Sequence, residues 1–260
     1  MVLVQLADLH IGAGWVATDP LRTLAATIDS VRRLDVAVDG VLALGDLAEH
    51  GSDEEYARTR AELERLEAPL YVVMGNRDDR EVLRRQFGLE PSDGAPLDYA
   101  TDLGPARLVV IDTTVPGEDE DAGKLDPVSL DWLKRELADH PEQGTLLAMH
   151  HPPLLTGSPA WDRYALSETS RTGLAEVLER HPQVTQILSA HLHRPVLTQF
   201  ASRPLLIGPS TYLQFPIGMQ ASRLDPTDEP PGFVVHFIAP GGGTISYFQT
   251  VTSGVTCDSV

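Results

Sequence analysis

The sequence predicts an α/β fold in which short buried strands alternate with amphipathic helices. Short apolar runs recur along the chain, helix-start signals separate them, and hydrophobic residues at helical spacing follow those signals. The chain has 260 residues, of which 42% are hydrophobic, so it can bury a sizeable core. Neither a repeat nor a linker divides the sequence, and a single domain over residues 1–260 is therefore expected.

The first third of the chain shows this alternation most clearly. Buried strands are predicted at Val2–Ala7, Gly40–Leu44 and Leu70–Met74. Thr18 and Asp19 offer an N-cap for a helix whose first turn contains Pro20. Ser52 and Glu55 have the spacing of a capping box and predict the start of a second helix.

The later elements follow the same signals with looser spacing. Further strands are predicted at Arg107–Ile111, Thr145–Met149, Val184–Ser189, Leu205–Ile207, Phe233–Ile238 and Thr244–Thr250. Helices are predicted over Arg80–Phe87, from Asp126 onward with Val128, Leu130, Leu133 and Leu137 on the buried side, and around Thr172–Arg180. The acidic run from Glu118 to Asp121 is expected on a solvated surface turn, with metal recruitment as the alternative.

The charge balance excludes several classes of function. Twenty Lys and Arg against 38 Asp and Glu give a net charge of −18, which repels nucleic-acid polymers and anionic membranes. No run approaches the roughly 18 apolar residues of a membrane span. The N-terminus lacks the pattern of a signal peptide, and the single Cys257 excludes an intrachain disulfide. A cytoplasmic protein is therefore expected.

Polar side chains that can bind metals follow five of the predicted strands. In open α/β sheets ligands bind at the carboxyl ends of the strands, so these five loops are expected to face one crevice. Residues i and i+2 of an extended segment point the same way, which lets Asp8 and His10, or His191 and His193, aim at one point. The candidate metal ligands are Asp8, His10, Asp46, Asn76, His150, His191 and His193.

Seven oxygen and imidazole ligands are too many for one tetrahedral ion. They suit two ions about 3.5–4 Å apart that share a bridging carboxylate. A donor set of Asp, Asn and His without thiolate suits Mn, Fe, Zn or Co, and does not distinguish among them.

These residues stand in five short motifs that together resemble the calcineurin-like metallophosphoesterases. The family pattern is D-x-H, G-D, G-N-H-D/E, a lone H and G-H-x-H. In this chain the pieces are Asp8-Leu9-His10, Gly45-Asp46, Gly75-Asn76-Arg77-Asp78, His150 within MHHPP, and Ala190-His191-Leu192-His193. The resemblance spans residues 8–193 and implies a four-layer α-β-β-α sandwich with two mixed sheets. Residues 194–260 would then supply a wall of the substrate pocket and the C-terminal strands.

The resemblance also implies a ligand set. One ion would lie on Asp8, His10, Asp46 and His193, and the other on Asp46, Asn76, His150 and His191, with Asp46 bridging. His151 would either orient the site or face the substrate. Asp78 is expected to orient the site, and Asp112 to form hydrogen bonds in a loop.

Two positions depart from the family pattern. Ala190 replaces Gly, with little expected consequence. Arg77 replaces a His that can donate a proton to the leaving oxygen, whereas Arg stays protonated and supplies only charge and hydrogen bonds. Asn76, Arg77 and His191 are the expected catalytic residues, and Asn76, Arg77 and His151 the expected substrate contacts. A salt bridge from Arg77 to Asp78 or Asp79 is the structural alternative.

Within the family, VMGNRDDR, IDTTVPG, LAMHHPP and SAHLHRP are similar to segments of the class III cyclic-nucleotide phosphodiesterases and the related glycerophosphodiesterases. The predicted activity is hydrolysis of a small phosphodiester, such as a cyclic nucleotide, by a metal-bridging hydroxide. Alternatives are a glycerophosphodiesterase, a phosphomonoesterase or pyrophosphohydrolase, and a non-catalytic scaffold. Tyr212 and Phe215 are expected in the core or in a pocket wall, and the C-terminal strands could support a homo-oligomer.

Overall fold

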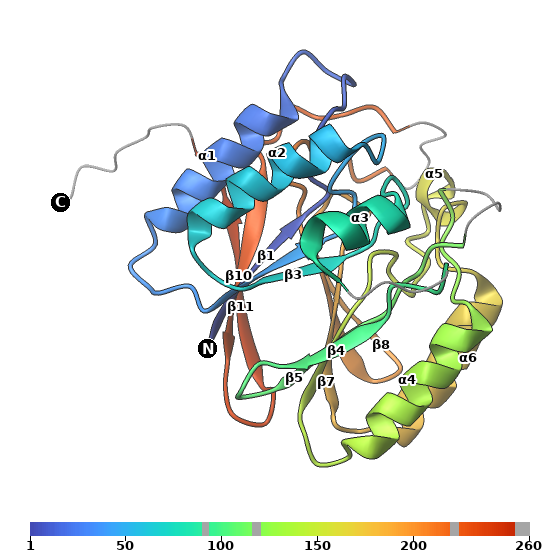
Figure 1. The fold of residues 1–260 in the computed structure, drawn as a ribbon. Helices are drawn as coiled ribbons and strands as arrows, with labels where there is room; N and C mark the ends of the chain where they lie inside the picture. Colours follow the sequence, from blue (N-terminus) through green and yellow to red (C-terminus); the bar gives the residue numbers. More distant parts are fainter. Residues whose placement is uncertain (90–93, 116–120, 219–223, 253–260) are drawn as a thin grey trace.

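Two β-sheets pack face to face, and helices cover the outer side of each sheet (Figure 1). The computed structural model describes residues 1–89, 94–115, 121–218 and 224–252. The arrangement has four layers in the order helix, sheet, sheet, helix. The fold class expected from the sequence is thereby confirmed.

The first sheet has five strands in the order β11-β10-β1-β2-β3. Its strands are β1 (Val2–Ala7), β2 (Gly40–Leu44), β3 (Leu70–Val73), β10 (Gly232–Ile238) and β11 (Thr244–Thr250). The pairs β1–β2 and β2–β3 are parallel, whereas β10 runs antiparallel to both β1 and β11. The sheet is therefore mixed, and its three parallel strands end at the same edge.

The second sheet has six strands in the order β4-β5-β6-β7-β9-β8. Its strands are β4 (Tyr99–Asp102), β5 (Arg107–Val110), β6 (Thr145–Ala148), β7 (Val184–Ser189), β8 (Val196–Phe200) and β9 (Arg203–Ile207). The four central strands are parallel, and the edge strands β4 and β8 are antiparallel to their neighbours. This sheet is mixed as well.

The helices divide between the two outer layers. They are α1 (Pro20–Arg32), α2 (Asp53–Leu63) with a short 3₁₀ turn η1 (Glu64–Leu66), α3 (Arg80–Phe87), α4 (Pro127–Asp139), α5 (Pro159–Asp162) and α6 (Glu168–Arg180). The expected caps are present: the Asp19 side chain accepts from the backbone of α1, and Ser52 and Glu55 form the capping box of α2. Helices α1, α2 and α3 pack on the first sheet, and α4 and α6 on the second (Figure 1).

Side-chain alternation along the strands builds three hydrophobic layers. In β1, Leu3 faces the second sheet, whereas Val4 and Leu6 face α1 and α2. In β2, Leu42 faces inward and Val41 outward in the same way. Strands buried on both faces are mostly apolar, which is why the sequence shows them as apolar runs interrupted by few polar residues, such as Gln5 in β1.

Three elements and one helix face differ from the sequence-based expectation. Strands β4 and β8 and helix α5 were not predicted, because each is short and carries polar residues that hide the strand or helix period. The predicted buried side of α4 is wrong at Val128, which is 61% exposed, whereas Leu133 and Leu137 are buried. Val128 lies in the first helical turn, where the chain enters the helix from solvent.

A buried polar relay joins the two sheets at their centre. The His236 imidazole on β10 donates from Nε2 to Oε1 of Gln5 on β1, at 3.0 Å. The Gln5 amide in turn donates to the carbonyl of Ser189 on β7, at 3.0 Å. The Ser246 hydroxyl lies 2.8 Å from His236 Nδ1 and satisfies that nitrogen. The relay satisfies polar groups that burial would otherwise penalise.

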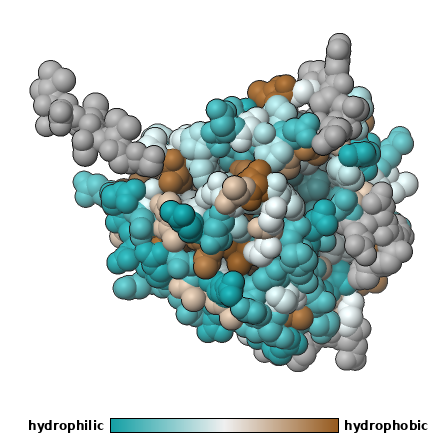
Figure 2. All heavy atoms as spheres, turned by 90° about the horizontal axis from the view of Figure 1, so that it is seen from above, coloured by the Kyte–Doolittle hydropathy of each residue, from teal (hydrophilic) through white to brown (hydrophobic). Residues whose placement is uncertain are grey.

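The surface is largely hydrophilic. The face shown in Figure 2 carries apolar side chains only in small separate groups. None of the helices in the described ranges combines the length and apolarity that a membrane crossing requires. Exposed apolar side chains of β10 and β11 include Phe237, Ile245 and Tyr247, and their use in a homo-oligomer stays a prediction.

We predict that His236→Gln reduces the loss of unfolding free energy that occurs when the pH is lowered. Burial lowers the pKa of His236 to about 3, so below about pH 6.5 the unfolded chain takes up a proton that the folded chain refuses. This histidine's contribution is therefore fully present above pH 6.5 and is lost as the pH falls. Between pH 7.5 and 5.0 the wild type should lose about 2 kcal/mol more unfolding free energy than the variant, measured by urea denaturation. Equal losses would contradict the assignment.

Candidate metal centre

The candidate site lies where the carboxyl ends of the two sheets meet. The loops after β1, β2, β3, β6 and β7 carry the seven expected residues, and the structure brings all seven together. The backbone N–H of His191, from the second sheet, donates to Asp8 of the first sheet at 3.0 Å. The Ser210 hydroxyl, after β9, donates to the Asp8 carbonyl at 2.7 Å. The two sheets are therefore joined directly through the candidate residues.

The loops hold these residues in an uncommon backbone conformation. Of the eight non-glycine residues with positive φ in the described ranges, five are candidate ligands. They are Asp8 (49°), His10 (48°), Asp46 (50°), His191 (71°) and His193 (48°). A left-handed conformation costs energy outside glycine, and such residues concentrate where a site needs its side chains aimed. The concentration here marks the edge as functional.

The first group consists of Asp8, His10 and His193, all buried. The Nε2 atoms of His10 and His193 face each other at 3.1 Å. Two nitrogens at about 2.1 Å from one ion and at right angles to each other would lie about 3.0 Å apart. Their Nδ1 atoms are engaged elsewhere, with Glu49 at 2.8 Å and with the Leu213 carbonyl at 2.9 Å. Such outer partners leave Nε2 unprotonated and aimed at an ion.

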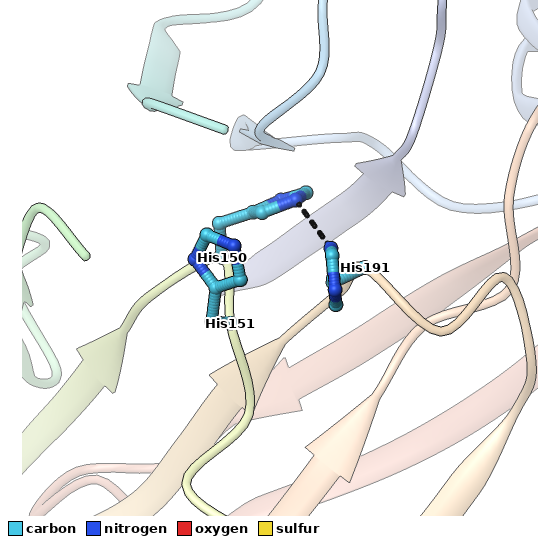
Figure 3. A group of neighbouring side chains, drawn as sticks. All are labelled: His150, His151 and His191. Atoms are coloured by element: carbon cyan, nitrogen blue, oxygen red, sulfur yellow. Dashed lines mark hydrogen bonds between the residues drawn. The ribbon is translucent and has the colours of Figure 1, made fainter. Parts of the chain in front are cut away.

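The second group is centred on His150. Its Nε2 atom lies 3.1 Å from Oδ1 of Asn76 and 3.2 Å from Nδ1 of His191. Figure 3 shows the His150 and His191 rings approaching from the ends of β6 and β7. The Nδ1 atom of His150 donates to the Leu44 carbonyl at 3.1 Å, so Nε2 is the nitrogen whose lone pair could bind an ion. These side chains could hold a second ion.

Asp46 lies between the two groups. Its Oδ2 atom is 3.5 Å from Nε2 of His10 and 3.5 Å from Nε2 of His150. The other oxygen, Oδ1, accepts the backbone N–H of Arg77 at 2.8 Å, which fixes the carboxylate plane. A single oxygen placed symmetrically between two imidazole nitrogens is the geometry that a bridging ligand requires.

The buried charges at this edge call for a cation. Burial would raise the pKa of Asp46, but the charge and hydrogen bond of His150, the charge of His10 and the backbone N–H of Arg77 together hold this pKa well below its usual range. Burial would lower the pKa of His150, yet Asp46 and Asp8 raise it to about 9. Burial raises the pKa of Asp8 to about 7. The two buried carboxylates therefore favour positive charge beside them, which protons on Asp8 and His150 can supply. A bound cation would supply the same charge in place of those protons.

Asp78 and Asp112 hold loops together, as expected. Oδ1 of Asp78 accepts the backbone N–H of Leu47 at 3.0 Å and the Tyr56 hydroxyl at 3.0 Å. Its Oδ2 accepts from Gly75 at 2.9 Å, so one carboxylate ties the loop after β2 to the loop after β3. Asp112 accepts from backbone N–H groups and pairs with Arg80.

His151 lies beneath the site. Its side chain is fully buried, its Nδ1 is 2.8 Å from the Thr113 hydroxyl, and its ring packs against those of His150 and His191 (Figure 3). It does not line the cavity described below. Of the two roles left open by the sequence, this burial favours orientation of its neighbours over contact with a substrate.

Arg77 forms its ion pair with Asp121, a partner that the sequence did not predict. Its Nη2 atom lies 3.0 Å from Oδ1 of Asp121, so the alternative reading, a salt bridge to Asp78 or Asp79, is wrong in its partner. The Asn76 amide donates to the same Asp121 oxygen at 3.3 Å. Asp121 lies on a partly exposed turn, as expected, and it also lines the cavity described below. Glu118, Asp119 and Glu120 lie outside the described residues.

A cavity of about 300 Å³ opens over the site. Its lining includes the candidate residues His10, Asp46, Asn76, Arg77, His191 and His193. It also includes residues that the sequence did not single out, namely Trp15, Trp161, Arg163, Tyr164 and Leu224. Tyr212 and Phe215 were expected either in the core or in a pocket wall. Phe215 lines this cavity, whereas Tyr212 is 3% exposed, does not line it and belongs to the core. No local motif marks these positions.

We predict that Gly75→Ala displaces Asp46. A Cβ atom at Gly75 would lie 2.2 Å from the Asp46 backbone nitrogen and 2.2 Å from its Oδ1 atom. The variant should therefore bind fewer metal ions per chain after loading with Mn²⁺, measured by elemental analysis alongside circular dichroism. Gly243→Ala is the control, because nothing lies within 4 Å of its added carbon. A folded Gly75→Ala variant with wild-type metal content would refute the expectation.

Curated relatives match most of the chain. A 3′,5′-cyclic adenosine monophosphate phosphodiesterase of Pseudomonas aeruginosa is 33% identical over 86% of this chain and 81% of its own length. A cAMP/cGMP dual specificity phosphodiesterase of Mycobacterium tuberculosis is 31% identical over 95% and 82%. A glycerophosphodiester phosphodiesterase of Enterobacter lignolyticus is 31% identical over 91% and 86%.

Solved structures and a family model complete the comparison. A dimetal phosphatase from Danio rerio matches with a TM-score of 0.69, at 16% identity and over 96% of each chain, and so shares the fold. The family model for calcineurin-like phosphoesterases matches residues 1–195, which contain every candidate ligand. The chain therefore belongs to the calcineurin-like phosphoesterase family, as its five motifs predicted, and that membership implies a dinuclear metal centre.

Proposed function

We propose that this protein is a dinuclear metal-dependent phosphodiesterase that hydrolyses small phosphodiesters, cyclic nucleotides foremost. The observation that carries the proposal is the Asp46 carboxylate, whose Oδ2 atom lies 3.5 Å from one imidazole of each donor group. The cavity above it is large enough for a small ligand. The relatives named for cyclic-nucleotide hydrolysis support the same substrate class.

The proposed ligand set divides the seven residues between two ions. Asp8, His10, Asp46 and His193 would hold one ion, and Asp46, Asn76, His150 and His191 the other. Mn, Fe, Zn and Co all suit these donors, because imidazole and carboxylate bind each of them. When bound, the pair supplies a Lewis acid and lowers the pKa of a water molecule, so that a nucleophile exists at neutral pH.

The protein's own residues would bind the phosphate and balance its charge. Arg77 and the Asn76 amide lie at the cavity wall, where they can donate to non-bridging phosphate oxygens. An arginine guanidinium does not transfer its proton, and His191 would be neutral as a ligand, so the leaving oxygen would take a proton from water. The buried His151 would hold His191 in position.

The same proposal also covers domain organisation, location and assembly. Residues 1–260 would act as one domain, a reducing cytoplasm would be its location, and an assembly of identical chains could form through β10 and β11. None of them is needed for the chemistry above.

Glycerophosphodiesters are the second candidate substrates. The Enterobacter lignolyticus relative named for that activity is as similar in sequence, at 31% identity, as the Mycobacterium tuberculosis relative. Both substrate classes present one phosphodiester to the same metal pair, and they differ in the groups attached to it. The choice between them therefore depends on the cavity wall rather than on the metals.

The first test is hydrolysis by Mn²⁺-loaded protein of bis-p-nitrophenyl phosphate beside p-nitrophenyl phosphate, with and without chelator. We expect a preference for the diester, and we expect chelator to abolish turnover. Preference for the monoester would replace the proposal with a phosphomonoesterase. Absence of turnover on both would favour a pyrophosphohydrolase or a non-catalytic scaffold.

Asp46→Ala should remove both metal pairing and turnover. Loss of an outer partner of a metal ligand typically costs about 10–100-fold, so loss of a ligand shared by two ions should cost more than roughly 100-fold in kcat. Asp131→Ala is the matched control, because Asp131 is exposed and forms its ion pair with Lys134 of the same helix. Full activity in Asp46→Ala would exclude the proposed centre.

A further inference from the structure

Four aromatic side chains form one wall of the cavity above the candidate metal centre. We call Trp15, Trp161, Tyr164 and Phe215 the aromatic wall. They come from separate parts of the chain: the loop after β1, helix α5 and the residues after it, and the loop after β9. Neither the metal ligands nor the mechanism proposed above uses them.

The aromatic wall adjoins the candidate ligands. The Trp15 ring centroid is 4.4 Å from that of His10, and the Phe215 centroid is 4.9 Å from that of His193. Trp161 lies 5.7 Å from His191 by the same measure. A group that stacks on the wall could therefore belong to the same small molecule as a phosphate bound at the candidate metal centre.

Three rings of the wall are contiguous, and one of them is open to a ligand. Phe215 bridges Trp15 and Trp161, with centroid distances of 6.4 and 5.5 Å. Trp161 and Phe215 are each 8% exposed and partly belong to the core, but Trp15 is 40% exposed. An indole left this open inside a cavity is not explained by core packing and is free to stack on a planar ligand.

Hydrogen bonds hold Trp15 in place before any ligand binds. Its Nε1–H donates to Oε1 of Glu49 at 3.2 Å, and Oε2 of the same carboxylate contacts His10 Nδ1 at 2.8 Å. One side chain thus fixes both a candidate ligand and the exposed indole. On the same wall, the guanidinium of Arg163 sits 4.5 Å from the Tyr164 ring centroid. A wall fixed in advance loses little entropy when a ligand binds.

We propose that the aromatic wall binds the nucleobase of the substrate, and that it selects cyclic nucleotides over glycerophosphodiesters. The inference rests on the proposed phosphodiesterase function and names its substrate class. A purine or pyrimidine offers a planar face for stacking. A glycerol group offers only hydroxyls, which the apolar rings of this wall leave without partners.

The kinetic test compares the kcat/KM for 3′,5′-cyclic AMP with that for glycerophosphoglycerol, whose two ester groups are both glycerol and carry no cation that could bind an aromatic ring. In Trp15→Ala we expect the ratio of the two values to fall roughly tenfold, as is common when an aromatic stacking partner of a base is removed. A ratio cancels any shared loss that arises through His10. Trp15→Phe keeps a ring but loses the hydrogen bond to Glu49, and should retain most of the ratio. Tyr247→Ala, which removes an exposed ring on β11, is the matched control.

Two kinetic outcomes would overturn the inference. One is an unchanged ratio in Trp15→Ala. The other is an equal fall in Trp15→Ala and Trp15→Phe, which would assign the effect to Glu49 rather than to stacking.

A binding measurement separates this inference from the proposed function. Calorimetric titration of Mn²⁺-loaded wild type should show AMP binding roughly tenfold more tightly than ribose 5-phosphate, which has the same phosphate and no base. This preference without any diester turnover would reject the proposed function and keep the base site. Diester turnover with equal affinity for the two ligands would reject the base site and keep the proposed function.

Discussion

The joint between the two sheets is the constraint on which the candidate site depends. Asp8 ends the central strand of the first sheet, and its carboxylate accepts the backbone N–H of His191 from the second sheet at 3.0 Å. Because both residues are buried, neither group can exchange its partner for water, and an unpaired carboxylate there would be costly. The relative position of the sheets and the position of the donor atoms are therefore set by the same contacts.

The loops at this joint carry strain that the rest of the fold must offset. Five candidate ligands have left-handed backbones, and two glycines permit close approach between the loops that carry ligands. A Cβ atom at Gly45 would lie 2.3 Å from Nδ1 of His150, and one at Gly75 would collide with Asp46. Neighbouring apolar strands are fully buried, so the scaffold has the stability to hold such loops. The donor atoms therefore face one another before any ion binds.

The sequence predicted the donor set but not the cavity around it. Each donor follows an apolar strand directly, so period-2 patterning and the parallel-strand rule place it at one edge. Trp15 and Asp121 lie in loops and Trp161 in the short helix α5; the positions of these segments depend on tertiary contacts, and no local spacing brings them together. Glu49 was missed for a related reason: its contact with His10 requires the loops after β1 and β2 to pair, as they do through His10 and Asp46. Short-range sequence patterns thus predict the candidate metal ligands, whereas the side chains that line the cavity above them are brought together by tertiary packing.

Arg77 shows how charge can replace a proton donor at such a site. In the structure its guanidinium pairs with Asp121, and the Asn76 amide donates to the same carboxylate oxygen. A phosphodiester anion would present oxygens of similar charge and geometry to these two donors, so Arg77 and Asn76 can exchange one anion for the other without any change of protonation. Arg77 has 38% of its side chain accessible, so such an exchange would take place at the water-facing end of the cavity. Proton transfer to the leaving oxygen would then be separate from phosphate binding, because an arginine that binds the charge cannot release a proton.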